Sequence, residues 1–146
     1  MRNLIITRRS SSIGALRKFK VYISDSKNPE LDICGVACRK LGVIRDGETL
    51  TFEIDNDVNR LFVIDSKRMR NTCCDSVHIF SGNDDVEFDG TCKFNPARLN
   101  PYVFDGEPDE MARRYRNVAN LKGVLTILGL VAIAVIIGTG AYALLF

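Results

Sequence analysis

Residues 49–65 read TLTFEIDNDVNRLFVID, and their pattern indicates the class of fold. Apolar residues occupy positions 50, 52 and 54, and polar residues stand between them, which is typical of a strand with one buried face. Residues 55–57 form a turn-favouring Asp-Asn-Asp cluster, and the run RLFVID after it predicts a returning strand. The sequence therefore predicts a mainly β domain.

The same pattern extends outward in both directions along the chain. Strands are predicted at residues 3–7, 18–24, 38–44, 49–54, 60–65, 77–80, 86–88 and 92–94. The dipeptide Asp46-Gly47 tolerates positive backbone φ and predicts a hairpin between the third and fourth of these strands. Short strands with regular turns predict a small antiparallel β-sandwich or barrel within residues 1–104. Its predicted core consists of Phe19, Val21, Ile23, Leu50, Phe52, Ile54, Leu61 or Phe62, Val63, Ile79 and Phe88.

The C-terminal segment 123–146, GVLTILGLVAIAVIIGTGAYALLF, contains no charged residue. As an α-helix it would be about 36 Å long, compared with roughly 30 Å of bilayer hydrocarbon. We therefore predict one C-terminal transmembrane helix, preceded at residues 105–122 by a linker and a basic juxtamembrane helix. A buried core helix is the alternative, but so small a domain cannot cover a uniformly apolar helix of this length.

Charged residues next to this segment predict its orientation. The N-terminal sequence MRNLIITRRS is not typical of a signal peptide, because Arg8 and Arg9 interrupt a short apolar run. The positive-inside rule then predicts a single-pass, tail-anchored protein with a cytoplasmic N-terminal domain. The basic residues that carry this prediction, and that we expect at the membrane surface, are Arg113, Arg114, Arg116 and Lys122.

Small residues within the predicted span offer a packing face. Ala134 and Gly138 lie four residues apart, which is the spacing of small-residue pairs at helix–helix contacts in membranes. This pair predicts a self-association face, although small residues are also common in membrane helices that do not associate.

The distribution of charge excludes one class of partner. All 18 acidic residues lie between Asp25 and Glu110, and only ten of the 20 basic residues lie in that interval. Binding of nucleic acid requires a concentrated basic face, which an acidic domain does not supply. We therefore expect lipid and protein partners, but no nucleic acid.

The candidate chemical groups are few. The five cysteines and single histidine suggest one metal site of three thiolates and an imidazole, made by Cys34, Cys38, Cys74 and His78. Buried free thiols are the competing interpretation, and a disulfide is a third. The chain contains no G-x-S-x-G motif and no phosphate-binding glycine loop, so we expect neither an enzyme nor a cofactor.

The strand succession also resembles a known family. The segments KFKVYISD (18–25), CGVACRKLGVIRDGETLTFEI (34–54) and RLFVI (60–64) look like the PEGA-type β-sandwich modules of bacterial envelope proteins. The family's Pro-Glu-Gly-Ala tetrapeptide is absent, and residues 26–37 correspond to an insertion. This resemblance implies an adhesion or scaffolding fold.

Together these patterns predict a non-enzymatic, tail-anchored membrane protein whose β domain is a protein-interaction or scaffolding module at the membrane surface. Its partner would be another protein or a second copy of the chain. The alternative is a membrane protein that binds metal or senses redox state through its cysteines.

Overall fold

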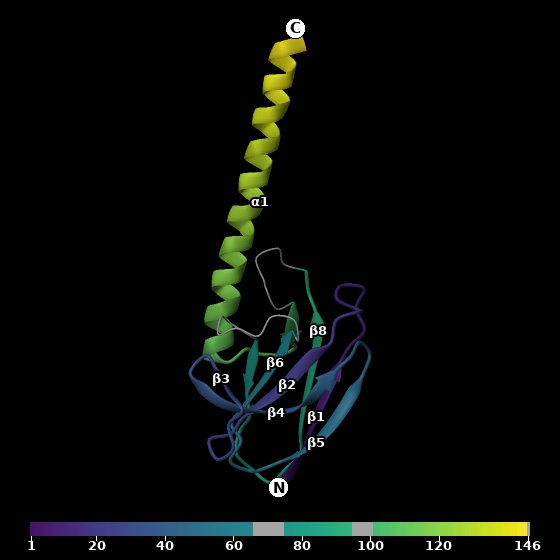
Figure 1. Cartoon of the computed structure of the whole chain (residues 1–146), viewed down its shortest axis with the longest axis vertical. Coiled ribbons are helices and arrows are strands. Elements are labelled where there is room, and N and C mark those ends of the chain that lie inside the picture. The colour runs from purple at the N-terminus through teal and green to yellow at the C-terminus, as the bar shows by residue number, and fades with distance from the viewer. Residues whose placement is uncertain (66–74, 95–100, 146) are drawn as a thin grey trace.

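The chain folds into β-strands and one long helix (Figure 1). The structure is a computed structural model that describes residues 1–65, 75–94 and 101–145, without the side chains of residues 111, 115, 119, 138 and 140–145. The elements are β1 (Arg2–Arg8), β2 (Phe19–Ser24), β3 (Leu31–Ile33), β4 (Val36–Ile44), β5 (Thr49–Ile54), β6 (Arg60–Asp65), β7 (Ser76–His78), β8 (Val86–Cys92), β9 (Tyr102–Phe104) and α1 (Glu110–Leu145). The predicted fold class, mainly β with one C-terminal apolar helix, is therefore confirmed.

The strands form two sheets. One has the order β5-β1-β8-β9 and the other the order β3-β4-β2-β6-β7. Adjacent strands are antiparallel except β1 and β8, which run parallel with Leu4 opposite Val86. A parallel pair cannot be joined by a tight turn, and here residues 9–85, which include all five strands of the second sheet, connect the two strands.

Alternating apolar residues from both sheets bury each other in one main core. Of the predicted core residues, Phe19, Val21, Ile23, Ile54, Leu61, Val63 and Ile79 are buried there, and Leu50, Phe52 and Phe88 pack against it partly buried. A second, smaller cluster contains Tyr22, Ile33, Cys38 and Phe62. Tyr22 and Phe62 are neighbours in the β2–β6 register, so this cluster lies on the other face of their sheet.

The predicted hairpin at Asp46-Gly47 is wrong. The turn itself forms, with Gly47 at φ +71° and the Glu48 amide donating to the Arg45 carbonyl at 3.3 Å. However, the two strands that it joins, β4 and β5, belong to different sheets, and β5 pairs with β1. Turn chemistry fixes only local backbone angles, whereas pairing follows from where the apolar face of each strand can be buried.

The limits of other strands also differ from the prediction, and β7 ends at His78 rather than at residue 80. The strands expected at 86–88 and 92–94 are one strand, β8, and Phe94 lies beyond its end. The short strands β3 and β9 were not predicted, because three residues are too few to display an alternating pattern.

The sandwich has two ends, which matter for function. Figure 1 shows that α1 leaves the domain toward the side on which β1 and β8 end. We call this side, with residues 9–18, 45–48 and 93–94, the helix-side end. The opposite side, with the loops at 25–30, 55–59 and 79–85, is the distal end.

The helix α1 is long and apolar enough to cross a membrane. The qualifying stretch is Ala112–Ile137, and only 6% of its apolar window is buried against the rest of the chain. Large apolar side chains such as Leu125, Leu130 and Ile136 are more than half exposed. A helix with so little of its apolar surface covered is not a core helix of the β domain.

Candidate functional site

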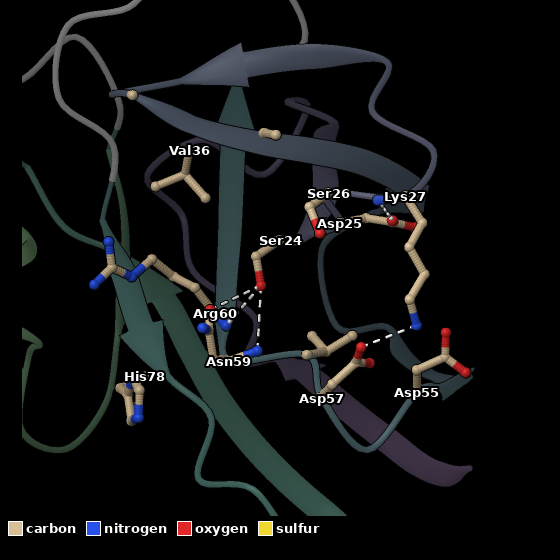
Figure 2. Close-up of a pocket in the computed structure, with 13 residues that line it drawn as sticks. Ser24, Asp25, Ser26, Lys27, Val36, Asp55, Asp57, Asn59, Arg60 and His78 are labelled. Atoms are coloured by element: carbon tan, nitrogen blue, oxygen red, sulfur yellow. Dashed lines mark hydrogen bonds and ion pairs between the residues drawn. The ribbon is translucent and has the colours of Figure 1, made fainter.

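A polar pocket of about 400 Å³ opens at the distal end of the domain. The pocket is lined by residues 24–27 at the end of β2 and after it, by residues 35–37 around the start of β4, by residue 55 and residues 57–60 before and in β6, and by His78 of β7. Figure 2 shows Ser24 and Asn59 between two groups of side chains, with Lys27, Asp55 and Asp57 on one side and Arg60 and His78 on the other. The pocket therefore carries both signs of charge.

Asp25 organises one wall of the pocket. Its carboxylate accepts the backbone N–H groups of Lys27 and Asn28, each at 2.9 Å, and the Nε of Arg39 at 2.7 Å. Such a turn is a local consequence of an aspartate before polar residues and a proline. The Asn28 amide and the Arg39 guanidinium hold the pKa of Asp25 below its usual value. Asp25 is therefore a structural anion at neutral pH.

An exposed ion pair forms the outer rim. Lys27 Nζ lies 2.9 Å from Asp57 Oδ2, and each side chain is 65% exposed. The hydrogen bond to Lys27 lowers the pKa of Asp57, and the same bond raises the pKa of Lys27. Because exposed pairs contribute little to stability, a ligand could separate these two charges at small cost.

The Ser24 hydroxyl is fully used for structure. It donates to Asn59 Oδ1 at 3.0 Å and accepts the backbone N–H groups of Asn59 and Arg60, each at 3.2 Å. A nucleophilic serine needs an adjacent base to take its proton, and here an amide oxygen receives it. The arrangement suits binding through hydrogen bonds better than covalent catalysis.

Arg60 connects the pocket to the base of α1. Its Nε lies 3.4 Å from Asp109 Oδ2, and its side chain, which lines the pocket, is 27% exposed. Asp109 in turn accepts the Ser76 hydroxyl at 2.9 Å and the Ala112 amide at 2.8 Å. Asp109 is thus the N-cap of the helix, where a carboxylate satisfies an unpaired amide and faces the positive end of the helix dipole.

A buried ion pair completes this helix junction, which we define as Asp75, Asp109 and Arg116. The Asp75 side chain is fully buried and accepts Arg116 Nε at 2.7 Å and the Phe104 amide at 2.8 Å. Arg116 binds both carboxylate oxygens and also donates to the Phe104 carbonyl at 3.0 Å. The first turns of α1 are therefore fixed to the edges of both sheets.

Three of the four predicted metal ligands lie in the described chain, and these three do not form a group with the arrangement of a metal site. Cys34 occupies the β3–β4 turn at φ 53°, Cys38 is buried in β4, and His78 ends β7, while Cys74 lies outside the described residues. Across residues 1–65, 75–94 and 101–145, no group of three or more His, Cys, Asp or Glu side chains has the arrangement of a metal site. Burial raises the pKa of Cys38 to about 12, so its thiol is protonated at neutral pH.

The predicted membrane-surface residues separate into two groups. Arg113, Arg114 and Lys122 are exposed on α1, as a headgroup contact requires. Arg116 instead holds Asp75 in the helix junction. Ala134 is exposed, but the surroundings of Gly138 lie outside the described side chains, so the predicted self-association face stays a prediction.

Sequence reasoning missed the helix junction. Asp109 had a usable signal, because an aspartate directly before a helical segment is a common N-cap. Asp75 had none, since its partner stands 41 residues later in the chain.

Comparison of the chain with family models, with curated proteins and with solved structures gave no significant match. The resemblance to PEGA-type modules therefore stays a prediction.

Proposed function

We propose that this chain is a non-enzymatic, single-pass membrane protein whose β domain lies in the cytoplasm and binds a protein partner through the distal pocket. The observation that carries the proposal is the helix junction. It attaches an exposed apolar helix to the domain through a buried ion pair and a capped N-terminus. A domain fixed to such a helix is held at the bilayer in one orientation, with the pocket on the side away from it.

The charges beside the apolar stretch support the cytoplasmic orientation. Arg113, Arg114 and Lys122 are exposed on the domain side of Gly123, the residue at which the uncharged segment begins. Exposed basic residues within a few turns of a span bias that side toward the cytoplasm.

The pocket supports binding rather than catalysis. Ser24 and Asp25 are engaged in structural hydrogen bonds, whereas Lys27 and Asp57 are exposed and reach the rim. A rim with one cation and one anion beside a polar floor suits a polar peptide segment with charges of both signs. The burial of the Cys38 thiol disfavours redox sensing at this position, because a sensing cysteine must be accessible as well as deprotonated.

The orientation can be tested on the full chain in intact cells. Asn28 is exposed and uses its backbone amide in the Asp25 turn, so Asn28→Cys adds an accessible thiol without loss of a contact. We expect a membrane-impermeant maleimide to label this cysteine, identified by peptide mass spectrometry, only after the cells are permeabilised. Labelling in intact cells would place the domain outside and refute the cytoplasmic assignment.

Partner binding can be tested by photo-crosslinking in the same membranes. A crosslinking amino acid at Asp55, in the pocket, should give a protein adduct of defined mass, whereas one at Thr51 on β5 should not. The exchange Lys27→Asp with Asp57→Lys keeps the rim pair but reverses its direction, and it should abolish the adduct. Equal adducts from both positions, or an adduct that survives the exchange, would contradict binding in the pocket.

A further inference from the structure

The helix-side end presents large apolar side chains to solvent. Leu16 is 99% exposed, Phe94 is 76% exposed and Ile13 is 38% exposed. Leu16 and Ile13 belong to the β1–β2 loop, and Phe94 follows β8. Outside α1, the two other exposed large apolar residues of the described chain, Met1 and Phe80, lie at the distal end.

A buried arginine holds this apolar loop in place. Arg8 is fully buried, and its guanidinium donates to the carbonyls of Arg17 and Gly14, each at 2.7 Å. Asp46 lies 3.2 Å from the same guanidinium and neutralises its charge. Burying a guanidinium is unfavourable unless it is paired and hydrogen-bonded. The loop is therefore built around Arg8, which fixes the backbone on both sides of Leu16 and keeps the Leu16 side chain exposed.

The charge of this end suits an anionic surface. Lys18 and Lys93 are exposed beside the apolar residues. Two nearby carboxylates are already neutralised, Asp46 by Arg8 and Asp105 by Arg9 at 2.6 Å. Exposed lysines next to apolar side chains are typical of protein surfaces that enter the headgroup layer of an anionic bilayer.

The length of α1 places this end close to the hydrocarbon. The helix is fixed to the domain at Arg116, and its uncharged part begins after Lys122. Six residues of helix extend about 9 Å. The headgroup layer on each side of a bilayer is roughly 5–8 Å thick. The domain therefore cannot stand far from the surface, and Figure 1 shows the β1–β2 loop rising on the same side as α1.

We infer that the helix-side end docks on the bilayer, with Leu16, Phe94 and Ile13 in the interfacial layer and Lys18 and Lys93 against anionic headgroups. The occupant of this apolar surface is lipid, and not a second copy of the chain. The inference rests on the proposed function only for the insertion of α1. It adds a second membrane contact, and that contact directs the distal pocket away from the bilayer.

The chain contains no tryptophan, so single tryptophans report their own surroundings. The probes are Leu16→Trp and Phe94→Trp at the helix-side end, Phe80→Trp at the distal end, where Phe80 is 79% exposed, and Ile133→Trp in α1. Each full-length variant is placed, one chain per disc, in nanodiscs of phosphatidylcholine and phosphatidylserine. The discs are prepared with and without nitroxide-labelled lipid, and iodide is the aqueous quencher.

We expect nitroxide lipid to quench the tryptophans at 16, 94 and 133, and iodide to quench only the tryptophan at 80. If iodide, and not nitroxide lipid, quenches the tryptophans at 16 and 94, while nitroxide lipid quenches the tryptophan at 133, docking is refuted and membrane insertion of α1 stands. If position 133 is not quenched by lipid, α1 does not enter the bilayer, and the proposed function and the inference both fail. Because each disc holds one chain, burial at 16 and 94 cannot come from a second copy.

The role of charge is tested with the same discs. Removing phosphatidylserine, or introducing Lys18→Glu with Lys93→Glu, should restore iodide quenching at position 94. If the tryptophan at position 94 stays protected from iodide after both changes, the contact of the two lysines with the headgroups is refuted.

Discussion

Arg116→Met tests whether the helix junction belongs to the folded core of the β domain. The substitution keeps much of the aliphatic stem of Arg116 but removes the guanidinium, leaving the fully buried Asp75 carboxylate with the Phe104 amide as a hydrogen-bond donor. Removing one partner of a buried ion pair costs about 3–5 kcal/mol. Arg116 retains 17% exposure, so we use the lower end, about 3 kcal/mol, which corresponds to roughly a 150-fold larger unfolded population.

The buried thiols of Cys38 and Cys92 supply the assay, because they lie in the two different core clusters. The full chain in vesicles is labelled with a maleimide, and modification of each cysteine is measured by peptide mass spectrometry. When opening and closing are fast compared with labelling, the rate follows the unfolded population. We therefore expect both thiols to react roughly 150-fold faster in Arg116→Met.

Two further variants separate a charge effect from lost packing. Arg114→Met, an exposed neighbour on α1, should change the labelling rate little, because surface substitutions usually cost less than about 0.5 kcal/mol. Asp75→Asn in the Arg116→Met background removes the unpaired charge and should recover much of the loss. Unchanged labelling in Arg116→Met would mean that the helix undocks without weakening the β domain, and the reasoning would be refuted.

Three shorter predictions follow from other contacts. Gly90→Ala should destabilise the domain by about 1–3 kcal/mol, because the added Cβ would lie 2.7 Å from Cε1 of Tyr102 and closer still to its hydroxyl. Chemical denaturation would measure this loss of stability, and an unchanged free energy of unfolding would contradict the packing. The folded-state pKa of Asp25 is lowered from 3.8, so its contribution to the free energy of unfolding is present above about pH 4 and is lost as the pH falls further. Asp25→Asn should therefore flatten the acid limb of a curve of stability against pH, and an unchanged acid limb would contradict this contribution. Burial raises the pKa of Cys38 to about 12. At pH 8 its thiol should therefore react with a maleimide far more slowly than the thiol of half-buried Cys34 in the folded protein. Equal labelling rates of the two thiols would contradict the burial of Cys38.

Features that depend on local periodicity could be predicted from the amino-acid sequence alone. Alternation identified β2 and β5, and the sequence predicted seven of the fifteen buried residues of the main core. An uninterrupted run of uncharged residues identified the apolar helix. These predictions succeed because burial of one face imposes a period of two on a strand, and because a long run of apolar residues without Pro is compatible with a continuous helix.

The way in which these elements combine became visible only in the folded chain. The tertiary structure placed β4 and β5 in different sheets despite the turn at Asp46-Gly47, since the turn leaves the choice of pairing partner open. It selected Asp75 as the partner of Arg116, and it assembled the distal pocket from segments that are separated along the chain. An ion pair or a pocket depends on which residues the topology brings within a few ångströms, and no local pattern encodes that proximity.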